Sequence, residues 1–303
     1  MPKISVIVPI YGVEQFIERC ARSLFEQTLC DIEYIFIDDC TPDYSMDILD
    51  SILNEYKCRL LADRKTVRVE RMPTNSGLPS VRKYGIHLAT GDYIVHCDSD
   101  DWVDISMYEK LYNLALKEDS DIVYCHYYLS DGKTNIPHND IQHNLMTGPL
   151  WNKLIKRNLY SNITEYPRFN KAEDGAYMVQ LSYFARKISL LEDYLYYYYQ
   201  NPSSICGNIS EKACLNKLQQ EFENTELRIR FLKRHNALLR HKTDVIKWKK
   251  YTRDNLLPLL GRYKYYKIWF NTYPEINYQY LFCSGIKFKE KLLFILYLLR
   301  FKK

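Results

Sequence analysis

The first 130 residues alternate between short β-forming segments and segments with helical periodicity. Residues 4–10 are rich in β-branched side chains, and between residues 14 and 28 the apolar residues recur at a 3.6-residue spacing. The same alternation predicts strands at 34–37, 67–71, 92–97 and 122–127, and helices at 42–53, 79–89 and 107–116. Strands separated by helices form a mostly parallel sheet with right-handed crossovers. The sequence therefore predicts an α/β domain with helices covering the sheet.

Polar residues follow three of the predicted strands. Tyr11 follows the first strand, Asp38–Asp39 end the second, and Asp98–Asp101 come after the segment at 92–97. Ligands of parallel sheets bind beyond the carboxyl ends of the strands. Three carboxylates in four residues cannot all stay ionised in a dry site without a cation, and carboxylate oxygens suit Mg²⁺ or Mn²⁺. We expect a metal–phosphate site; the alternative is a solvated acidic turn that caps a helix starting near Asp104.

The pattern becomes less regular after residue 130. We expect a loop over 130–150, a short basic helix over 151–158, a helix over 171–185 and a strand over 188–199. Glu173 and Asp174 stand at the start of the 171–185 helix, where the helix dipole alone would explain two acidic residues.

A change of character near residue 205 suggests a domain boundary. After that point the strand–helix alternation stops, and charged segments with helical periodicity follow. We therefore expect one domain over residues 1–205 and a helical C-terminal region over residues 206–303.

The cysteines and the apolar segments limit the cellular location. The nine cysteines are odd in number and scattered, with no Cys-x-x-Cys pair, so neither a disulfide framework nor a zinc site is expected. No window reaches the roughly 20 apolar residues that a membrane span needs. No charged and apolar leader is apparent at the N-terminus. We expect a cytoplasmic protein.

Positive charge is concentrated at the C-terminal end. Residues 284–303 contain six basic residues and one acidic residue, so their net charge of +5 equals the formal net charge of the whole chain. Residues 292–299 are apolar on every side and are bracketed by cations, as in segments that lie in an anionic membrane surface. Burial in the protein, a dimer contact and a nucleic-acid patch are the alternatives. Membrane contact is favoured and a nucleic-acid partner is not expected.

The motifs, in this order and spacing, resemble those of the family 2 glycosyltransferases, especially bacterial enzymes of capsule and O-antigen polysaccharide synthesis. The resemblance covers roughly residues 4–205. It is carried by the segments Val8-Pro9-Ile10-Tyr11-Gly12, Asp38-Asp39-Cys40-Thr41, Asn75-Ser76-Gly77 with Arg82 and Gly85, Ala89-Thr90-Gly91-Asp92-Tyr93 with Asp98 to Asp101, Trp151-Asn152-Lys153, and Glu173-Asp174. Gly12 and Cys40 depart from the residues usual in the family. The resemblance implies the GT-A fold, a Rossmann-like, mostly parallel sheet flanked by helices.

The resemblance also implies roles for individual residues. Asp174 would be the catalytic base, and Asp100 would bind a Mn²⁺ or Mg²⁺ cofactor. The nucleotide of the donor, in most such enzymes UDP, would be held by Pro9, Tyr11, Asp39, Asn75, Arg82, Asp98 and Ser204.

Together these roles imply an inverting, metal-dependent transfer of a sugar from a nucleotide-diphosphate sugar to a glycan or lipid-linked glycan. The enzyme would work at the inner face of the cell membrane as a peripheral protein. The alternative is a non-catalytic nucleotide-sugar-binding or scaffold protein of the same fold. A nicotinamide dehydrogenase is not expected, because no Gly-x-Gly-x-x-Gly follows a predicted strand.

Overall fold

The computed structural model describes residues 1–139, 148–201 and 208–299. It contains two compact units, which are described separately. The first unit consists of residues 1–168 and 177–201, and the second consists of residues 169–176 and 202–303. The division therefore falls inside one helix, α5 (Glu173–Phe184).

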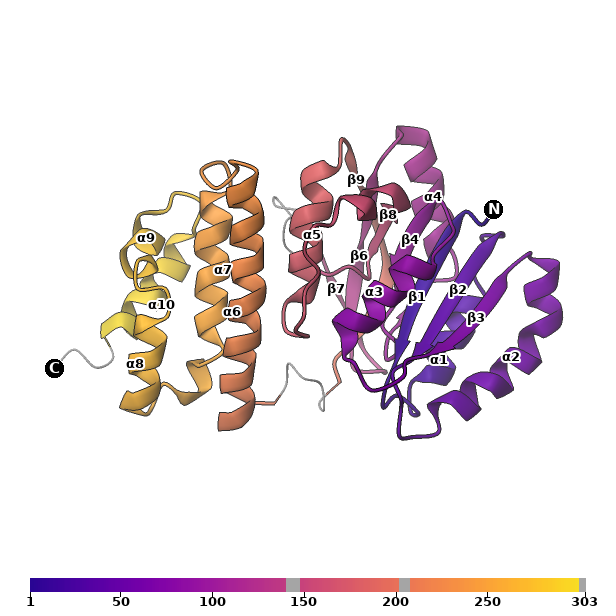
Figure 1. Cartoon of the computed structure of the whole chain (residues 1–303), viewed down its shortest axis with the longest axis horizontal. Helices are drawn as coiled ribbons and strands as arrows, with labels where there is room; N and C mark the ends of the chain where they lie inside the picture. Colours follow the sequence, from indigo (N-terminus) through magenta and orange to yellow (C-terminus); the bar gives the residue numbers. More distant parts are fainter. Residues whose placement is uncertain (140–147, 202–207, 300–303) are drawn as a thin grey trace. The chain divides into compact units, whose positions relative to one another are not determined.

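The first unit is built around one mixed β-sheet (Figure 1). In the described residues its strand order is β3-β2-β1-β4-β8-β6-β9-β5, and β7 pairs with β6 outside this path. The strands are β1 (Ile4–Ile10), β2 (Ile32–Asp38), β3 (Thr66–Arg71), β4 (Tyr93–His96), β5 (Trp102–Val103), β6 (Ile122–Ser130), β7 (Asn135–His138), β8 (Lys153–Lys156) and β9 (Ile188–Tyr199).

Strands β1, β2, β3 and β4 are parallel neighbours. β1 pairs with β2 from Ile4↔Ile32 to Ile10↔Asp38, and with β4 from Ile4↔Tyr93 to Ile7↔His96. β2 also pairs with β3 in parallel register. The carboxyl ends of these strands therefore lie at one edge of the sheet, as the sequence predicts, and the polar residues that follow β1, β2 and β4 meet there.

Helices cover both faces of this sheet. They are α1 (Ile17–Phe25), α2 (Ser45–Ala62), α3 (Leu78–Leu88), α4 (Met107–Glu118), the 3₁₀ helix η1 (Arg157–Asn162) and α5. One core joins α1, α2 and α4 to alternate residues of β1, and the other joins α3, η1 and α5 to the opposite face. The period of two along a strand separates Val6 and Val8 in the first core from Ile7 in the second.

Two segments differ from the prediction. Residues 151–158, expected to be a helix, form the strand β8 followed by η1, and part of the expected loop at 130–150 forms the edge strand β7. β8 pairs with β4 on one side and β6 on the other, so Leu154 and Ile155 are fully buried. Pairing with strands distant in sequence outweighs the local helical pattern.

The second unit is helical in its described part beyond residue 207. Its elements are α6 (Glu211–Arg234), α7 (Lys242–Asp254), the 3₁₀ helix η2 (Leu257–Leu259), α8 (Tyr263–Asn271), α9 (Ile276–Phe282) and α10 (Phe288–Leu299). Trp269, Tyr280 and Phe294 lie in its own apolar core. Within the described residues, no helix has the length and apolar character needed to cross a membrane.

Gly85 sets how closely α3 approaches the sheet. A Cβ atom at this position would lie 2.5 Å from Cγ2 of Ile7 and 3.0 Å from Cδ1 of Ile37. Both isoleucines are fully buried, so their side chains have little room to move away. The close approach matters for the site because α3 also carries Arg82.

We predict that Gly85→Ala destabilises the fold. Overpacking costs roughly 1–3 kcal/mol, against about 0.5–1 kcal/mol that alanine gains over glycine in a helix. Thermal unfolding should show a lower melting temperature. Asn113→Ala, at an exposed position of α4, is the control and should melt at or above the wild-type temperature. A Gly85→Ala variant as stable as wild type would contradict this account.

Candidate active site

The loop after β1 is fixed to the loop after β2. Gly12 has a left-handed φ of +67°, and its N–H donates to Oγ1 of Thr41 at 2.8 Å. Thr41 directly precedes the helix predicted at 42–53, but α2 begins at Ser45, and Thr41 instead holds the two loops together. Tyr11 is left 53 % exposed at the sheet edge, while Pro9 lies within β1 opposite Ile37.

Asp43 reinforces the same connection and was not singled out from the sequence. Its carboxylate accepts hydrogen bonds from the hydroxyls of Thr41 and Ser45, both at 2.6 Å, and from the N–H of Glu14 at 2.9 Å. Burial raises the pKa of Asp43, but these hydrogen bonds outweigh it and leave the pKa below its usual range.

Asp39 holds the loop that leads into α3. Its two carboxylate oxygens accept the N–H groups of Ser76 at 2.7 Å and Gly77 at 2.9 Å. Gly77 has a φ of +79°, which glycine adopts without strain. Asn75, the preceding residue, is exposed at this edge. Asp39 therefore shapes the Asn75 loop, and each of its oxygens has a second lone pair available to a ligand.

Arg82 supports the acidic segment from below. It lies on the sheet-facing side of α3, only 1 % exposed, and its Nη2 donates to Oδ1 of Asp98 at 2.7 Å. A buried guanidinium favours the ionised carboxylate and fixes its direction. Arg82 and Asp98, both predicted from the sequence to hold the nucleotide, therefore form an ion pair with each other.

The remaining carboxylates of the segment differ in their surroundings. Asp101 is buried and accepts the Tyr196 hydroxyl at 2.6 Å and the N–H of Tyr199 at 2.7 Å. Burial and the neighbouring acids raise the pKa of Asp101 well above its usual range. Burial, followed by the charge of Asp98, raises the pKa of Asp100 to about 6. Asp101 therefore attaches the segment to β9, and a nearby cation would stabilise the ionised form of Asp100.

A divalent cation fits the oxygen chemistry of this segment but would need ligands from a substrate. Among residues 1–139, 148–201 and 208–299, no group of three or more His, Cys, Asp or Glu side chains is arranged to hold a metal. Asp100 provides one hard oxygen donor in a site crowded with negative charge. Mg²⁺ and Mn²⁺ are commonly bound by one or two carboxylates together with substrate phosphates.

Arg19 closes the other side of the acidic segment. Its Nη2 donates to the backbone carbonyl of Asp100 at 3.1 Å, and its guanidinium lies 3.6 Å from the centre of the Trp102 ring. The ring of Tyr199 is 5.0 Å away. Nothing local in the sequence distinguishes Arg19 from other polar residues of α1, because its partners are 80 or more residues away.

Asp174 belongs to the second unit, at the start of α5. Ala172, two residues earlier, has a left-handed φ of +63°, which is unfavourable for a residue with a Cβ. Its carbonyl accepts a hydrogen bond from Nη2 of Arg228 at 2.7 Å. Ser204 lies outside the described residues.

Comparison with known proteins identifies the family. Residues 5–178 match the family described as "Glycosyl transferase family 2". The chain belongs to this family. It is 33 % identical over 244 residues to the uncharacterized glycosyltransferase EpsJ of Bacillus subtilis, covering 74 % of this chain and 68 % of that one. It is 30 % identical over 276 residues to the poly(ribitol-phosphate) beta-glucosyltransferase of Bacillus spizizenii, covering 82 % of this chain and 42 % of that one.

Solved structures confirm the GT-A fold of this glycosyltransferase. The structure of S. aureus TarS 1–349 with UDP-GlcNAc superposes with a TM-score of 0.59 at 19 % identity, covering 84 % of this chain and 81 % of that one. The Pyrobaculum calidifontis mannosyltransferase PcManGT, with GDP-Man and Mn²⁺, gives 0.58 at 13 % identity, covering 99 % and 81 %. The expected enzyme class and the helical C-terminal region are confirmed as well.

We predict that Asp39→Asn weakens UDP binding. The amide nitrogen cannot accept a backbone N–H, so either Ser76 or Gly77 loses its partner and the Asn75 loop loosens, at a cost of roughly 1–3 kcal/mol. Titration calorimetry with UDP should show at least about a tenfold weaker affinity. Asp50→Asn, the same change at an exposed position of α2, should bind UDP as wild type does. Unchanged UDP affinity in a folded Asp39→Asn variant would contradict the prediction.

Proposed function

We propose that this enzyme transfers a sugar from a UDP-sugar to a hydroxyl of a glycan or lipid-linked glycan, in bacterial surface polysaccharide synthesis of the capsule or O-antigen type. The observation that carries the proposal is the acidic segment after β4, which lies between Arg82 and Arg19 at the edge where β1 and β2 also end. UDP-GlcNAc bound to TarS supports UDP as the nucleotide.

Nucleotide binding would use the edges of the two fixed loops. The exposed Tyr11 and the backbone near Pro9 line one side, and Asp39 and Asn75 line the other. Asp39 offers acceptor oxygens to the donor groups of a base, and Asp98, held by Arg82, offers one to the ribose. We propose that Ser204 contributes to the same nucleotide site.

Departure of the nucleoside diphosphate requires positive charge next to its phosphates. Mn²⁺ or Mg²⁺, when bound, would supply that charge, and Asp100 is the residue that we propose holds it. Mn²⁺ in the PcManGT structure supports a divalent ion. Asp98 is paired with Arg82 and Asp101 accepts the Tyr196 hydroxyl, whereas Asp100 has no cationic side chain paired with its carboxylate among the ion pairs of the described residues.

Activation of the acceptor requires a carboxylate that takes a proton from a sugar hydroxyl. We propose Asp174 for this role, in which general base catalysis contributes typically about 10²–10⁴-fold. A base acting on the face opposite the leaving group gives a single displacement, so the product has the inverted anomeric configuration.

Two observations support the proposed acceptor class. The relative from Bacillus spizizenii is named for a poly(ribitol-phosphate) acceptor, which supports a polymer that carries phosphate. The helix α10 buries Phe294 in the second unit's core but leaves other large apolar side chains exposed, namely Phe288, Leu292, Leu293, Leu296 and Leu299. Lysines 287, 289 and 291 adjoin this surface, which supports contact with an anionic membrane at its cytoplasmic face and a lipid-linked acceptor.

The decisive test is the release of UDP from a panel of UDP-sugars, with acceptor extract, Mn²⁺ or Mg²⁺, and again with chelator. We expect metal-dependent release from one sugar, reduced at least about 100-fold in Asp100→Asn. Asp174→Asn should abolish transfer and keep UDP affinity, and Asp50→Asn should behave as wild type. Transfer that continues in chelator, or a product that retains the donor's anomeric configuration, would contradict the metal role or the inverting course respectively.

Membrane contact is tested with the double variant Leu292→Glu/Leu296→Glu. These positions are one helical turn apart on the exposed side of α10, so two charges there should oppose insertion. Sedimentation with phosphatidylglycerol vesicles should show loss of binding. Ile209→Glu/Leu239→Glu, at exposed positions elsewhere in the second unit, is the matched control. Equal loss in both double variants, or in neither, would contradict a specific role for α10.

A further inference from the structure

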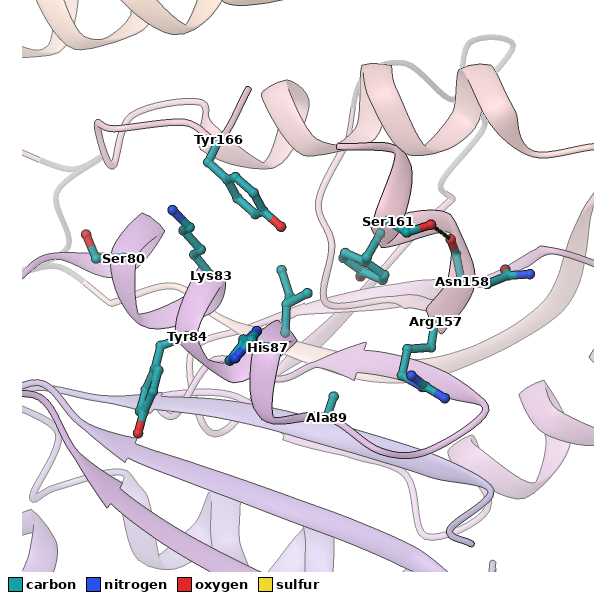
Figure 2. A pocket seen from close by; sticks show the side chains of 11 residues that line it. Ser80, Lys83, Tyr84, His87, Ala89, Arg157, Asn158, Ser161 and Tyr166 are labelled. Carbon is teal, nitrogen blue, oxygen red and sulfur yellow. Dashed lines mark hydrogen bonds between the residues drawn. The ribbon is translucent and has the colours of Figure 1, made fainter. Parts of the chain in front are cut away.

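A cleft of about 850 Å³ lies in the first unit (Figure 2), and none of residues 98–101 of the acidic segment lines it. One wall is the outer side of α3, where Ser80, Lys83, Tyr84 and His87 follow one another at helical spacing. The other wall is η1 with Arg157, and Tyr166 lies above (Figure 2). The opposite side of α3 carries Arg82 and Gly85, which pack toward the sheet.

Positive charge dominates this cleft. Its eleven lining residues include the cations Lys83 and Arg157 and the imidazole of His87, but no aspartate or glutamate. The hydroxyl of the lining residue Tyr84 donates to Glu70, and that carboxylate is itself paired with Arg68 at 2.6 Å. Arg157 is anchored by its Nε, which donates to the carbonyl of Gly91 at 2.6 Å. The cleft is therefore complementary to an anion.

Aromatic rings accompany the cations. The Lys83 ammonium lies 4.8 Å from the centre of the Tyr166 ring, and Tyr84 forms part of the α3 wall. From Ser80 to Ala89 the α3 wall extends for about 14 Å at 1.5 Å per residue, which is longer than one sugar. Cations bind phosphate or carboxylate groups, and rings offer flat apolar surface to sugars.

We propose that this cleft binds the acceptor as an acidic, phosphate-bearing glycan chain, an inference that rests on the proposed glycosyl transfer. α3 begins directly after Gly77, whose N–H is held by Asp39, so the cleft and the predicted nucleotide loop belong to the two ends of one structural element. A chain along α3 would bind through several contacts without occupying the nucleotide site.

The test uses the variant Lys83→Gln/His87→Gln and a four-unit ribitol-phosphate oligomer as the probe. We expect the variant to bind the oligomer at least about tenfold more weakly, because two cationic or polar contacts are lost. Lys57→Gln/Lys117→Gln removes two exposed lysines outside the cleft and should change binding less than twofold. Maltotetraose, which is neutral, should not bind, and saturating UDP should not displace the oligomer.

Four outcomes would overturn the cleft proposal. The first three are equal oligomer binding by wild type and the cleft variant, equal weakening in the control variant, and displacement of the oligomer by UDP. The fourth is competition between phosphatidylglycerol vesicles and the oligomer for the same residues, which would identify the ligand as a lipid headgroup. Failure of the proposed glycosyl transfer would be recognised by a different result: wild-type protein would then release no UDP from donor sugars, whether or not the oligomer binds.

A second, independent observation concerns the start of α5 within the second unit. Arg228 of α6 is buried, and its Nη2 donates to the carbonyl of Ala172, the residue with the left-handed φ. A Cβ at Gly175 would lie 2.6 Å from Cζ of Arg228, so the chain fits around the guanidinium only because residue 175 is glycine. Burial lowers the pKa of Arg228, while the carboxylates of Glu173 and Asp174 act in the opposite direction.

We infer that Arg228 is a positioning residue for Asp174, an inference that rests on the proposed role of Asp174 as base. The guanidinium holds the strained backbone at Ala172 and lies against Gly175, so the backbone of the two residues between them, Glu173 and Asp174, is fixed in direction. Because Arg228 does not belong to the nucleotide site, its loss should affect turnover and not donor affinity.

Kinetics of Arg228→Gln, Arg228→Lys and Gly175→Ala test this inference. We expect kcat to fall at least about tenfold in Arg228→Gln and in Gly175→Ala, with the donor KM and UDP affinity unchanged and partial recovery in Arg228→Lys. Arg240→Gln, at an exposed position, is the control. Wild-type kcat in Arg228→Gln while Asp174→Asn is inactive would overturn this inference alone. Full activity in Asp174→Asn would instead overturn the base assignment.

Discussion

The crowding of three carboxylates after β4, with Asp101 buried and Asp98 and Asp100 partly buried, is the constraint on which the rest of the site depends. Each buried acid needs its own compensation, since an unpaired charge in such a place is strongly unfavourable. Asp98 has the Arg82 guanidinium, and Asp101 has the Tyr196 hydroxyl and a backbone N–H. These partners come from α3 and β9, so the acidic segment determines how a helix from one core and a strand from the far side of the sheet must be placed.

Local pattern was sufficient for much of this fold. Strand β1 has the predicted bounds, Ile4 to Ile10, because its run of buried β-forming residues is almost continuous and Tyr11 with Gly12 ends it. The segment at 151–158 was predicted wrongly for the opposite reason. Four residues of strand between β4 and β6 are stabilised by pairing with residues about 30 to 60 positions away, and no window along the chain contains that information.

For the candidate site, the sequence located the carboxyl edge but not the contacts made there. Asp39, interpreted as a ligand for the base, already accepts two backbone N–H groups, and Arg82 is paired with Asp98. A sequence motif indicates that a residue matters to the site, but it does not show whether the side chain contacts a ligand or another part of the protein. Arg19 and Tyr196 belong to no motif, and only the folded chain brings them to the acidic segment.

The C-terminal unit supports the start of α5 through a residue that lies outside the family match. The match ends at residue 178, yet the backbone just before Asp174 is held by Arg228, 50 residues beyond that limit. Residues 169–176 form a compact unit with the C-terminal helices, while the acidic segment belongs to the sheet. The start of α5 is therefore fixed by the helical unit and the acidic segment by the sheet, and in the proposed mechanism these two regions would carry the acceptor base and the donor site respectively.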